Sequence, residues 1–114
     1  MALRATNREA GQIIFVELSG RITLGDGSAL LRKTIRSLLA DQKTKILLNL
    51  GDVDYIDSSG IGELVSGFTA VKNQGGDLKL LNLTKKVRDL LQITKLYTIF
   101  DVFTDEDVAL GSFR

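Results

Sequence analysis

The sequence predicts an α/β fold in which a mixed β-sheet of four to five strands packs against about four α-helices. Short apolar runs rich in β-branched residues alternate with longer segments whose apolar residues recur every three to four positions. The length of 114 residues fits one domain, residues 1–114. A hydrophobic content of 44% and a charged content of 25% are ordinary for a folded domain and exclude a disordered chain.

The segment up to residue 24 is predicted to form a β-hairpin. Its first strand is the β-branched and aromatic run at 13–18, and its second is the shorter run at 21–24. Ser19 and Gly20 separate the two runs, and glycine is a residue that tight turns favour. We therefore expect the chain to reverse direction at Gly20.

A helix and a central strand are predicted next. The loop at 25–28 ends in residues that cap helices. Apolar residues then mark one face of a helix over 29–40, at Leu31, Ile35, Leu38 and Leu39. The run at 45–50 is apolar at nearly every position, which is typical of a strand covered on both faces.

The second half of the chain repeats this alternation. Apolar residues at helical spacing begin at Ile61, and the glycines at 75–76 end the predicted helix. A strand at 78–83 follows, and Thr84 is placed to cap the next helix.

The C-terminal residues predict a last strand around Phe100 and a short helix that ends near Leu110. The sequence at 104–107 resembles a capping box that opens this helix. Phe100, Phe103 and Phe113 are expected to join the core or to cover it. The predicted order is therefore β-β-α-β-α-β-α-β-α.

His, Cys and Pro are absent, and this excludes many kinds of active site. Without His there is no catalytic triad or imidazole base, and without Cys there is no disulfide, thiolate nucleophile or zinc finger. We expect no metal and no cofactor. A net charge of +1 argues against direct nucleic-acid binding. No apolar run approaches the ~18 residues of a membrane span, so we expect a cytoplasmic protein with no membrane segment.

The most informative segment is residues 54–62, where a strand end, an acid and two hydroxyls precede a helix. Asp57, Ser58 or Ser59 can each accept a hydrogen bond from the free N–H groups of the first helical turn. Clusters of this kind are common as simple helix caps. Two adjacent hydroxyls exceed what one cap needs, however, so one is free to accept a phosphate at a helix N-terminus.

Other phosphate and nucleophile motifs do not fit this segment. Gly60 and Gly62 keep the first turn free of side-chain bulk, but no Lys follows them as a phosphate-binding loop requires. The Gly-x-Ser-x-Gly elbow of hydrolases is also absent. Asp57 is a poor receiver aspartate because no acidic cluster ends the first strand. The basic residues at 85–88 are interpreted as a solvated face, since aromatic residues that stack on bases are scarce.

Residues 55–62 closely resemble the signature of the STAS-domain anti-sigma factor antagonists. The resemblance covers nearly the whole chain, including the segments at 16–22, 46–50, 73–76 and 90–96. One position departs from the pattern: family members often carry an acid where this chain has Thr23, and the nearest acid is Asp26. This departure bears on the identity of the partner kinase more than on the fold.

The resemblance implies a bacterial regulator of transcription that works by partner switching and is not an enzyme. In such a switch, the unphosphorylated antagonist binds an anti-sigma factor with a histidine-kinase-like ATPase fold, and a sigma factor is released. The kinase phosphorylates a serine, the complex separates, and a serine phosphatase restores the antagonist. By position the acceptor is Ser58 and the cap is Ser59, although two adjacent serines cannot be ranked from the sequence alone.

The partner-binding surface is expected on two segments that each follow a strand. It comprises Asp57, Ser59, Gly60 and Gly62, together with Gly25, Asp26, Gly27 and Ser28. Three alternatives stay open. The chain is a subunit of a stressosome-like assembly, a subunit of a lipid or anion transporter complex, or a domain that binds a small molecule.

Overall fold

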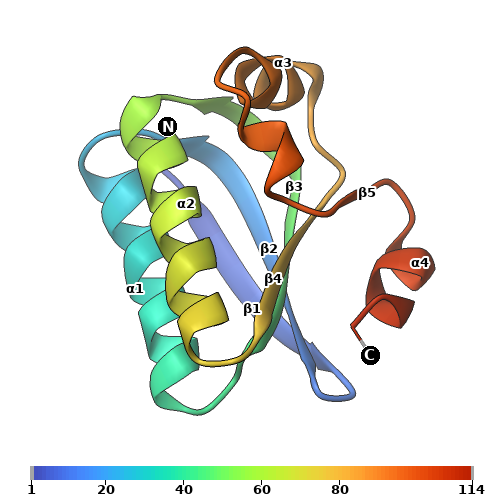
Figure 1. The fold of residues 1–114 in the computed structure, drawn as a ribbon. Coiled ribbons are helices and arrows are strands. Elements are labelled where there is room, and N and C mark those ends of the chain that lie inside the picture. The colour runs from blue at the N-terminus through green and yellow to red at the C-terminus, as the bar shows by residue number, and fades with distance from the viewer. Residues whose placement is uncertain (1, 114) are drawn as a thin grey trace.

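The computed structural model describes residues 2–113 and contains the predicted mixed sheet, with strand order β1-β2-β3-β4-β5 (Figure 1). The strands are β1 Arg4–Ala10, β2 Ile13–Ile22, β3 Lys45–Ile56, β4 Asp77–Leu81 and β5 Val102–Phe103. The helices are α1 Asp26–Ala40, α2 Ser58–Asn73, α3 Lys85–Ile93 and α4 Glu106–Gly111, with a 3-10 turn at Leu96–Thr98. β1 and β2 are antiparallel, and all other neighbouring strands are parallel.

The hairpin of the sheet is formed by β1 and β2, so the predicted reversal at Gly20 is wrong. The chain turns between Ala10 and Ile13, and Gly20 lies inside β2 beside a register irregularity. Glycine is required at Gly20 because its φ is +108° and an added Cβ would lie 2.3 Å from the Ala2 carbonyl oxygen. β1 was not predicted because it is a polar edge strand with almost no buried side chain.

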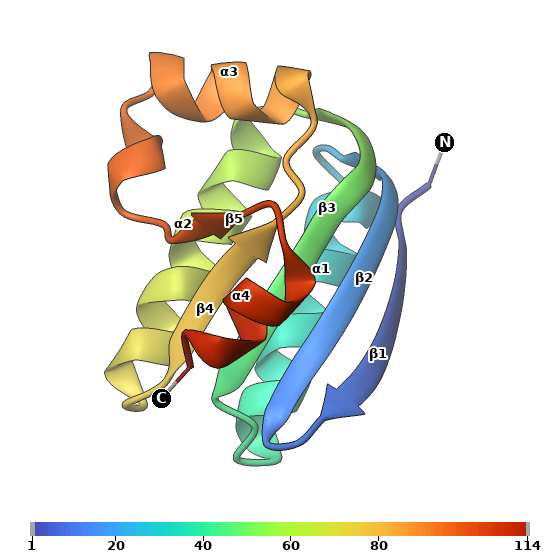
Figure 2. The same cartoon turned by 90° about the vertical axis from the view of Figure 1, so that its right-hand side faces the viewer.

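The helices cover the two faces of the sheet unequally (Figures 1 and 2). α1 and α2 lie side by side on one face, where they bury the main core. Three of the large side chains of that core are Leu31 of α1, Leu64 of α2 and Leu48 of β3. The short α4 packs on the opposite face, over a smaller cluster of Phe15, Leu47, Leu81, Ala109 and Phe113.

The boundaries of three elements differ from the sequence prediction. α1 begins at Asp26, because the 25–28 segment is the start of the helix and not a separate loop. β3 continues through residues 51–56, where its pairing with β2 outlasts the apolar run. The last strand is β5, and Phe100 precedes it as a buried core residue.

The capping predictions have mixed outcomes. Thr84 caps α3, since its Oγ1 accepts a hydrogen bond from the Val87 N–H. The cap of α4 is Asp105, whose carboxylate accepts from the Val108 N–H, so the predicted capping box is displaced by one residue. α2 ends at Asn73 before Gly75, whose φ of +80° stops the helix as predicted.

The carboxyl ends of β2, β3 and β4 meet at one end of the sheet. There β2 leads into α1, β3 leads into α2, and β4 leads into α3, which lies across this end (Figure 1). Ligands of parallel sheets commonly bind at such an end. None of the helices within residues 2–113 has both the length and the apolar content to cross a membrane.

Candidate functional site at the start of α2

Asp57 is the side chain that organises this end of the sheet. Its Oδ1 accepts a hydrogen bond from the Gly60 N–H at 2.9 Å, which caps α2, and its Oδ2 accepts from the Leu24 N–H at 2.9 Å. These backbone donors, Leu24 first and Gly60 second, lower the pKa of the Asp57 carboxyl below its ordinary value. One carboxylate therefore joins the chain after β2 to the start of α2.

Ser58 is the exposed first residue of α2, and Ser59 beside it is half-buried. The predicted role of Ser59 as the cap is wrong, because Asp57 satisfies the donor that a serine hydroxyl would have bound. Among the described residues, neither serine side chain forms a hydrogen bond to another protein group. The Ser58 hydroxyl thus faces solvent at the positive end of a helix, where an anion is favoured.

The segment that follows β2 lies directly beside Asp57, as the bond from Leu24 requires. Asp26 is exposed on the first turn of α1, whereas Ser28 is buried and its hydroxyl donates to the Thr23 carbonyl oxygen at 2.8 Å. Thr23 itself is half-buried, and its carbonyl oxygen accepts this bond. Gly25 and Asp26 are therefore accessible, while Ser28 holds the turn.

The glycines of this site separate into buried and exposed ones. An added Cβ on Gly60 would lie 2.1 Å from the Ile22 carbonyl oxygen, and one on Gly27 would lie 2.6 Å from the Arg21 carbonyl oxygen. Both glycines permit close packing of a helix start against β2. Gly62 and Gly25 have open space where a Cβ would be added, so only these two offer bare backbone to an approaching molecule.

An ion pair links the two helices next to the site. The Arg32 guanidinium of α1 donates to the Glu63 carboxylate of α2, with Nε at 3.0 Å from Oε2. The hydrogen bond and charge of Glu63 raise the pKa of Arg32. The pair fixes α1 against α2 one turn beyond Ser59.

Sequence reasoning missed the apolar residues at this end. Leu24 is 79% exposed, Tyr55 is 46% exposed and Ile93 is 77% exposed. Leu24 adjoins Asp57 through its backbone, and Tyr55 and Ile93 line one groove. In the sequence each of them is only an apolar residue at the end of a strand or helix. Such a residue is ordinarily predicted to belong to the core.

No metal site accompanies this arrangement within residues 2–113, where no three potential metal-ligating side chains converge. The site consists of an exposed hydroxyl, a carboxylate held by hydrogen bonds and the N-terminus of a helix. The N-terminus of a helix is a place where a phosphate group is favoured.

Comparisons with known proteins place this chain in a family. The STAS domain family model matches residues 4–109. The anti-sigma-B factor antagonist of Bacillus subtilis is 39% identical over 89 residues, which are 78% of this chain and 80% of that protein. An anti-sigma factor antagonist from Mycobacterium paratuberculosis has a similar fold, with a TM-score of 0.87 at 19% identity over 99% of this chain and 95% of that one.

A further solved structure is that of the Bacillus cell fate determinant SpoIIAA in the phosphorylated form. It gives a TM-score of 0.76 at 19% identity, over 97% of this chain and 100% of that one. At this identity the likeness shows the fold alone. The family model and the Bacillus subtilis relative carry the assignment: the chain belongs to the STAS domain family and is similar to its anti-sigma factor antagonists.

Proposed function

We propose that this protein is an anti-sigma factor antagonist that works by partner switching, with Ser58 as its phosphorylation site. The unphosphorylated chain binds an anti-sigma factor that has a histidine-kinase-like ATPase fold, and a sigma factor is released. The kinase then moves the γ-phosphoryl group of ATP to Ser58 Oγ. The hydroxyl proton passes to a base of the kinase, ADP leaves, and a serine phosphatase later hydrolyses the phosphoserine.

The observation that supports this proposal is the exposed Ser58 hydroxyl, which lies beside a carboxylate that already accepts two hydrogen bonds. Both carboxylate oxygens of Asp57 accept hydrogen bonds from backbone N–H groups, so the hydroxyl of Ser58 is not needed to cap α2. A side chain that forms no hydrogen bond within the fold is free to enter the active site of a kinase. The phosphorylated form of SpoIIAA, a protein of the same fold, supports the idea that this fold tolerates the modification.

Charge explains why phosphorylation ends the complex. A phosphate adds about −1.5 to −2 charges beside the Asp57 carboxylate. In the free protein this charge is hydrated and lies at the positive end of α2, so the fold persists. In a complex the phosphate must lose its hydration or lie against the partner. Negative charges that are held close together at such an interface cost several kcal/mol.

The test uses the anti-sigma factor kinases of the source organism, purified and incubated with this protein and ATP. We expect mass spectrometry to find phosphate on Ser58, none on the Ser58→Ala variant, and undiminished labelling of Ser59→Ala as the matched control. Ser58→Ala should bind the kinase as the wild type does. Ser58→Asp should bind about tenfold more weakly, and the phosphorylated protein about a hundredfold more weakly.

Two outcomes contradict the proposal. One is phosphate on Ser59 or elsewhere in the Ser58→Ala variant at the wild-type rate. The other is failure of the wild-type protein to bind any of these kinases at micromolar concentration.

A further inference from the structure

A groove separates the carboxyl end of β3 from α3, directly beside the proposed phosphorylation site. Its volume is about 260 Å³. The lining residues are Tyr55 and Ile56 of β3 and Lys86, Asp89, Leu90 and Ile93 of α3. Tyr55 and Ile56 immediately precede Asp57 and Ser58 in the chain, so an occupant of the groove lies within a few residues of the phosphate acceptor.

Two apolar side chains of this groove, Tyr55 and Ile93, are exposed, whereas Ile56 is buried and Leu90 is half-buried. Within residues 2–113, five large hydrophobic side chains are strongly exposed, and Tyr55 and Ile93 are two of them. A third is Leu24, whose backbone N–H donates to the Asp57 carboxylate. Exposed apolar side chains that share one groove, as Tyr55 and Ile93 do, are typical of a protein contact.

Some charged side chains at the groove have an ion-pair partner and others do not. The Asp89 carboxylate accepts from Lys85 at 2.8 Å, so this acid already has a cation beside it. Lys86 is exposed and forms no ion pair or hydrogen bond with another described residue. Arg21, which pairs with Tyr55 across β2 and β3, is also exposed and unpaired within residues 2–113. Lys86 in the groove lining and Arg21 on the strand next to Tyr55 therefore supply two unpaired cations, which complement a negatively charged occupant.

We propose that the groove binds a segment of the anti-sigma factor that carries a large apolar side chain next to a carboxylate. The apolar side chain packs between Tyr55 and Ile93, and the carboxylate pairs with Lys86. The inference rests on the proposed function and adds the chemistry of the contact. It also links the contact to the switch, because a phosphate on Ser58 would repel this carboxylate as well as lose its own hydration.

The test measures the affinity of variants for the kinase that labels Ser58, without ATP turnover. We expect Ile93→Ser and Tyr55→Ser each to weaken binding about tenfold. Val108→Ser is the matched control, because Val108 is an exposed aliphatic residue on α4, and its exposed fraction of 59% lies between those of Tyr55 and Ile93; binding should stay within about twofold. Lys86→Glu should weaken binding about tenfold at low salt and less at high salt. Arg36→Glu on α1 is its matched control.

Saturating kinase separates docking from chemistry. The groove variants should still be labelled on Ser58 when the kinase is in excess, whereas Ser58→Ala should never be labelled. Thermal unfolding of each variant checks that the fold is intact, which is expected because Ile93 and Lys86 are exposed.

The outcomes separate this inference from the proposed function. If Ser58→Asp weakens binding while Ile93→Ser, Tyr55→Ser and Lys86→Glu bind as the wild type does, the groove is not the docking site and the partner switch stands. If Lys86→Glu binds more tightly, the occupant is basic and the inference is overturned. If the wild type binds no kinase, the proposed function fails and the inference fails with it.

Discussion

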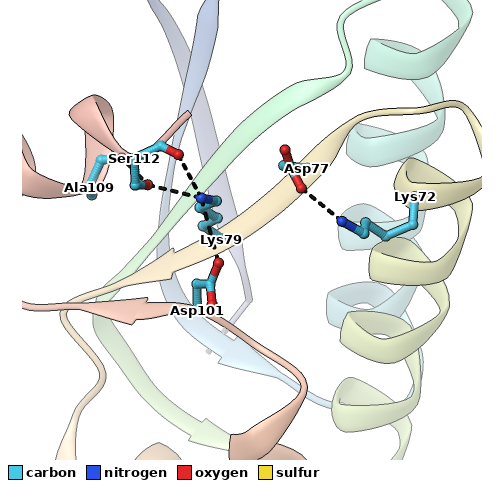
Figure 3. A network of polar contacts seen from close by, with 6 residues as sticks. All are labelled: Lys72, Asp77, Lys79, Asp101, Ala109 and Ser112. Carbon is cyan, nitrogen blue, oxygen red and sulfur yellow. Dashed lines mark hydrogen bonds and ion pairs between the residues drawn. The ribbon is translucent and has the colours of Figure 1, made fainter. Parts of the chain in front are cut away.

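The start of α2 and the face of the sheet under α4 differ in whether their polar side chains have hydrogen-bond partners within the protein. Under α4, Lys79 of β4 is only 8% exposed, yet its ammonium group is satisfied within the chain (Figure 3). Its Nζ donates to the carbonyl oxygen and to Oγ of Ser112, each at 3.0 Å, and lies 3.5 Å from an Asp101 carboxylate oxygen. At the start of α2 the Ser58 hydroxyl is exposed, as is the Lys86 ammonium group on the neighbouring α3, and neither has a partner among the described residues.

The difference shows how to separate side chains that hold the fold from those that meet another molecule. The Ser112 hydroxyl accepts from Lys79 and donates to the Ala109 carbonyl oxygen at 2.6 Å, and the Phe113 ring lies 4.9 Å from the Lys79 ammonium group. The bonds from Lys79 to Ser112 fasten the end of the chain after α4 to β4. Polar and apolar groups that are left unused at α2 are the ones available to a partner.

The largest effect is expected where the backbone itself is packed at the α2 site. Gly60→Ala should lower the free energy of unfolding by about 3 kcal/mol, because the new methyl group would overlap the Ile22 carbonyl oxygen and the Ile56 side chain. Gly62→Ala is the matched control in the same helix. It meets open space and should stabilise the protein by about 0.5–1 kcal/mol. Urea unfolding of both variants tests this contrast, and equal effects at the two glycines would contradict it.

The next effect tests the opposite role of two lysines. Lys79→Ala should cost about 2 kcal/mol of unfolding free energy, since it leaves the Ser112 carbonyl and hydroxyl oxygens without their donor. Lys79→Met keeps the apolar stem and should cost less. Lys86→Ala should change stability by less than about 0.5 kcal/mol.

Kinase binding should show the reverse order. Lys86→Ala should weaken the complex, and Lys79→Met should leave it unchanged. A stability loss at Lys86 as large as at Lys79 would remove the distinction between the two regions.

The sequence predicted best where apolar spacing and burial agree. Leu31 and Ile35 marked α1, and Leu47 and Leu48 marked β3, because a helix stripe and a doubly covered strand leave a pattern in one dimension. β1 left no such pattern, since its residues are polar and only the pairing with β2 makes it a strand. Gly20 was misread for a related reason: its glycine is required by the approach of Ala2, a contact that local sequence does not encode.

The site was predicted in part for the same reasons. The order of Asp57, Ser58 and Ser59 placed an acid and hydroxyls at a helix start, but only the bond from the Leu24 N–H shows that Asp57 holds two segments together. The groove beside it was missed because Tyr55 and Ile93 are 38 positions apart and meet only after α3 folds onto the sheet. Lys79 was missed because an isolated lysine in a strand gives no sign of burial.

The smallest effect concerns Asp57, the acid whose carboxylate is held by backbone N–H groups at the start of α2. Asp57→Asn keeps an oxygen for the Gly60 N–H but turns an N–H₂ group toward the Leu24 N–H, so one hydrogen bond is lost. The wild type should therefore be the more stable protein at pH 7. Because folding lowers the pKa of Asp57, its stabilising contribution is complete above the unfolded-state pKa of about 3.9 and is lost as the pH falls through the lower folded-state pKa.

The difference in unfolding free energy between wild type and Asp57→Asn should thus be constant from neutral pH down to about 5 and should shrink below about 4. Urea unfolding of both proteins across this range measures it. A difference that stays constant in acid would mean that the carboxylate charge contributes nothing at this position. The link between Leu24 and α2 would then depend on hydrogen bonds that do not need the charge of Asp57, unlike the Lys79 network, in which a charged group lies beside the Asp101 carboxylate.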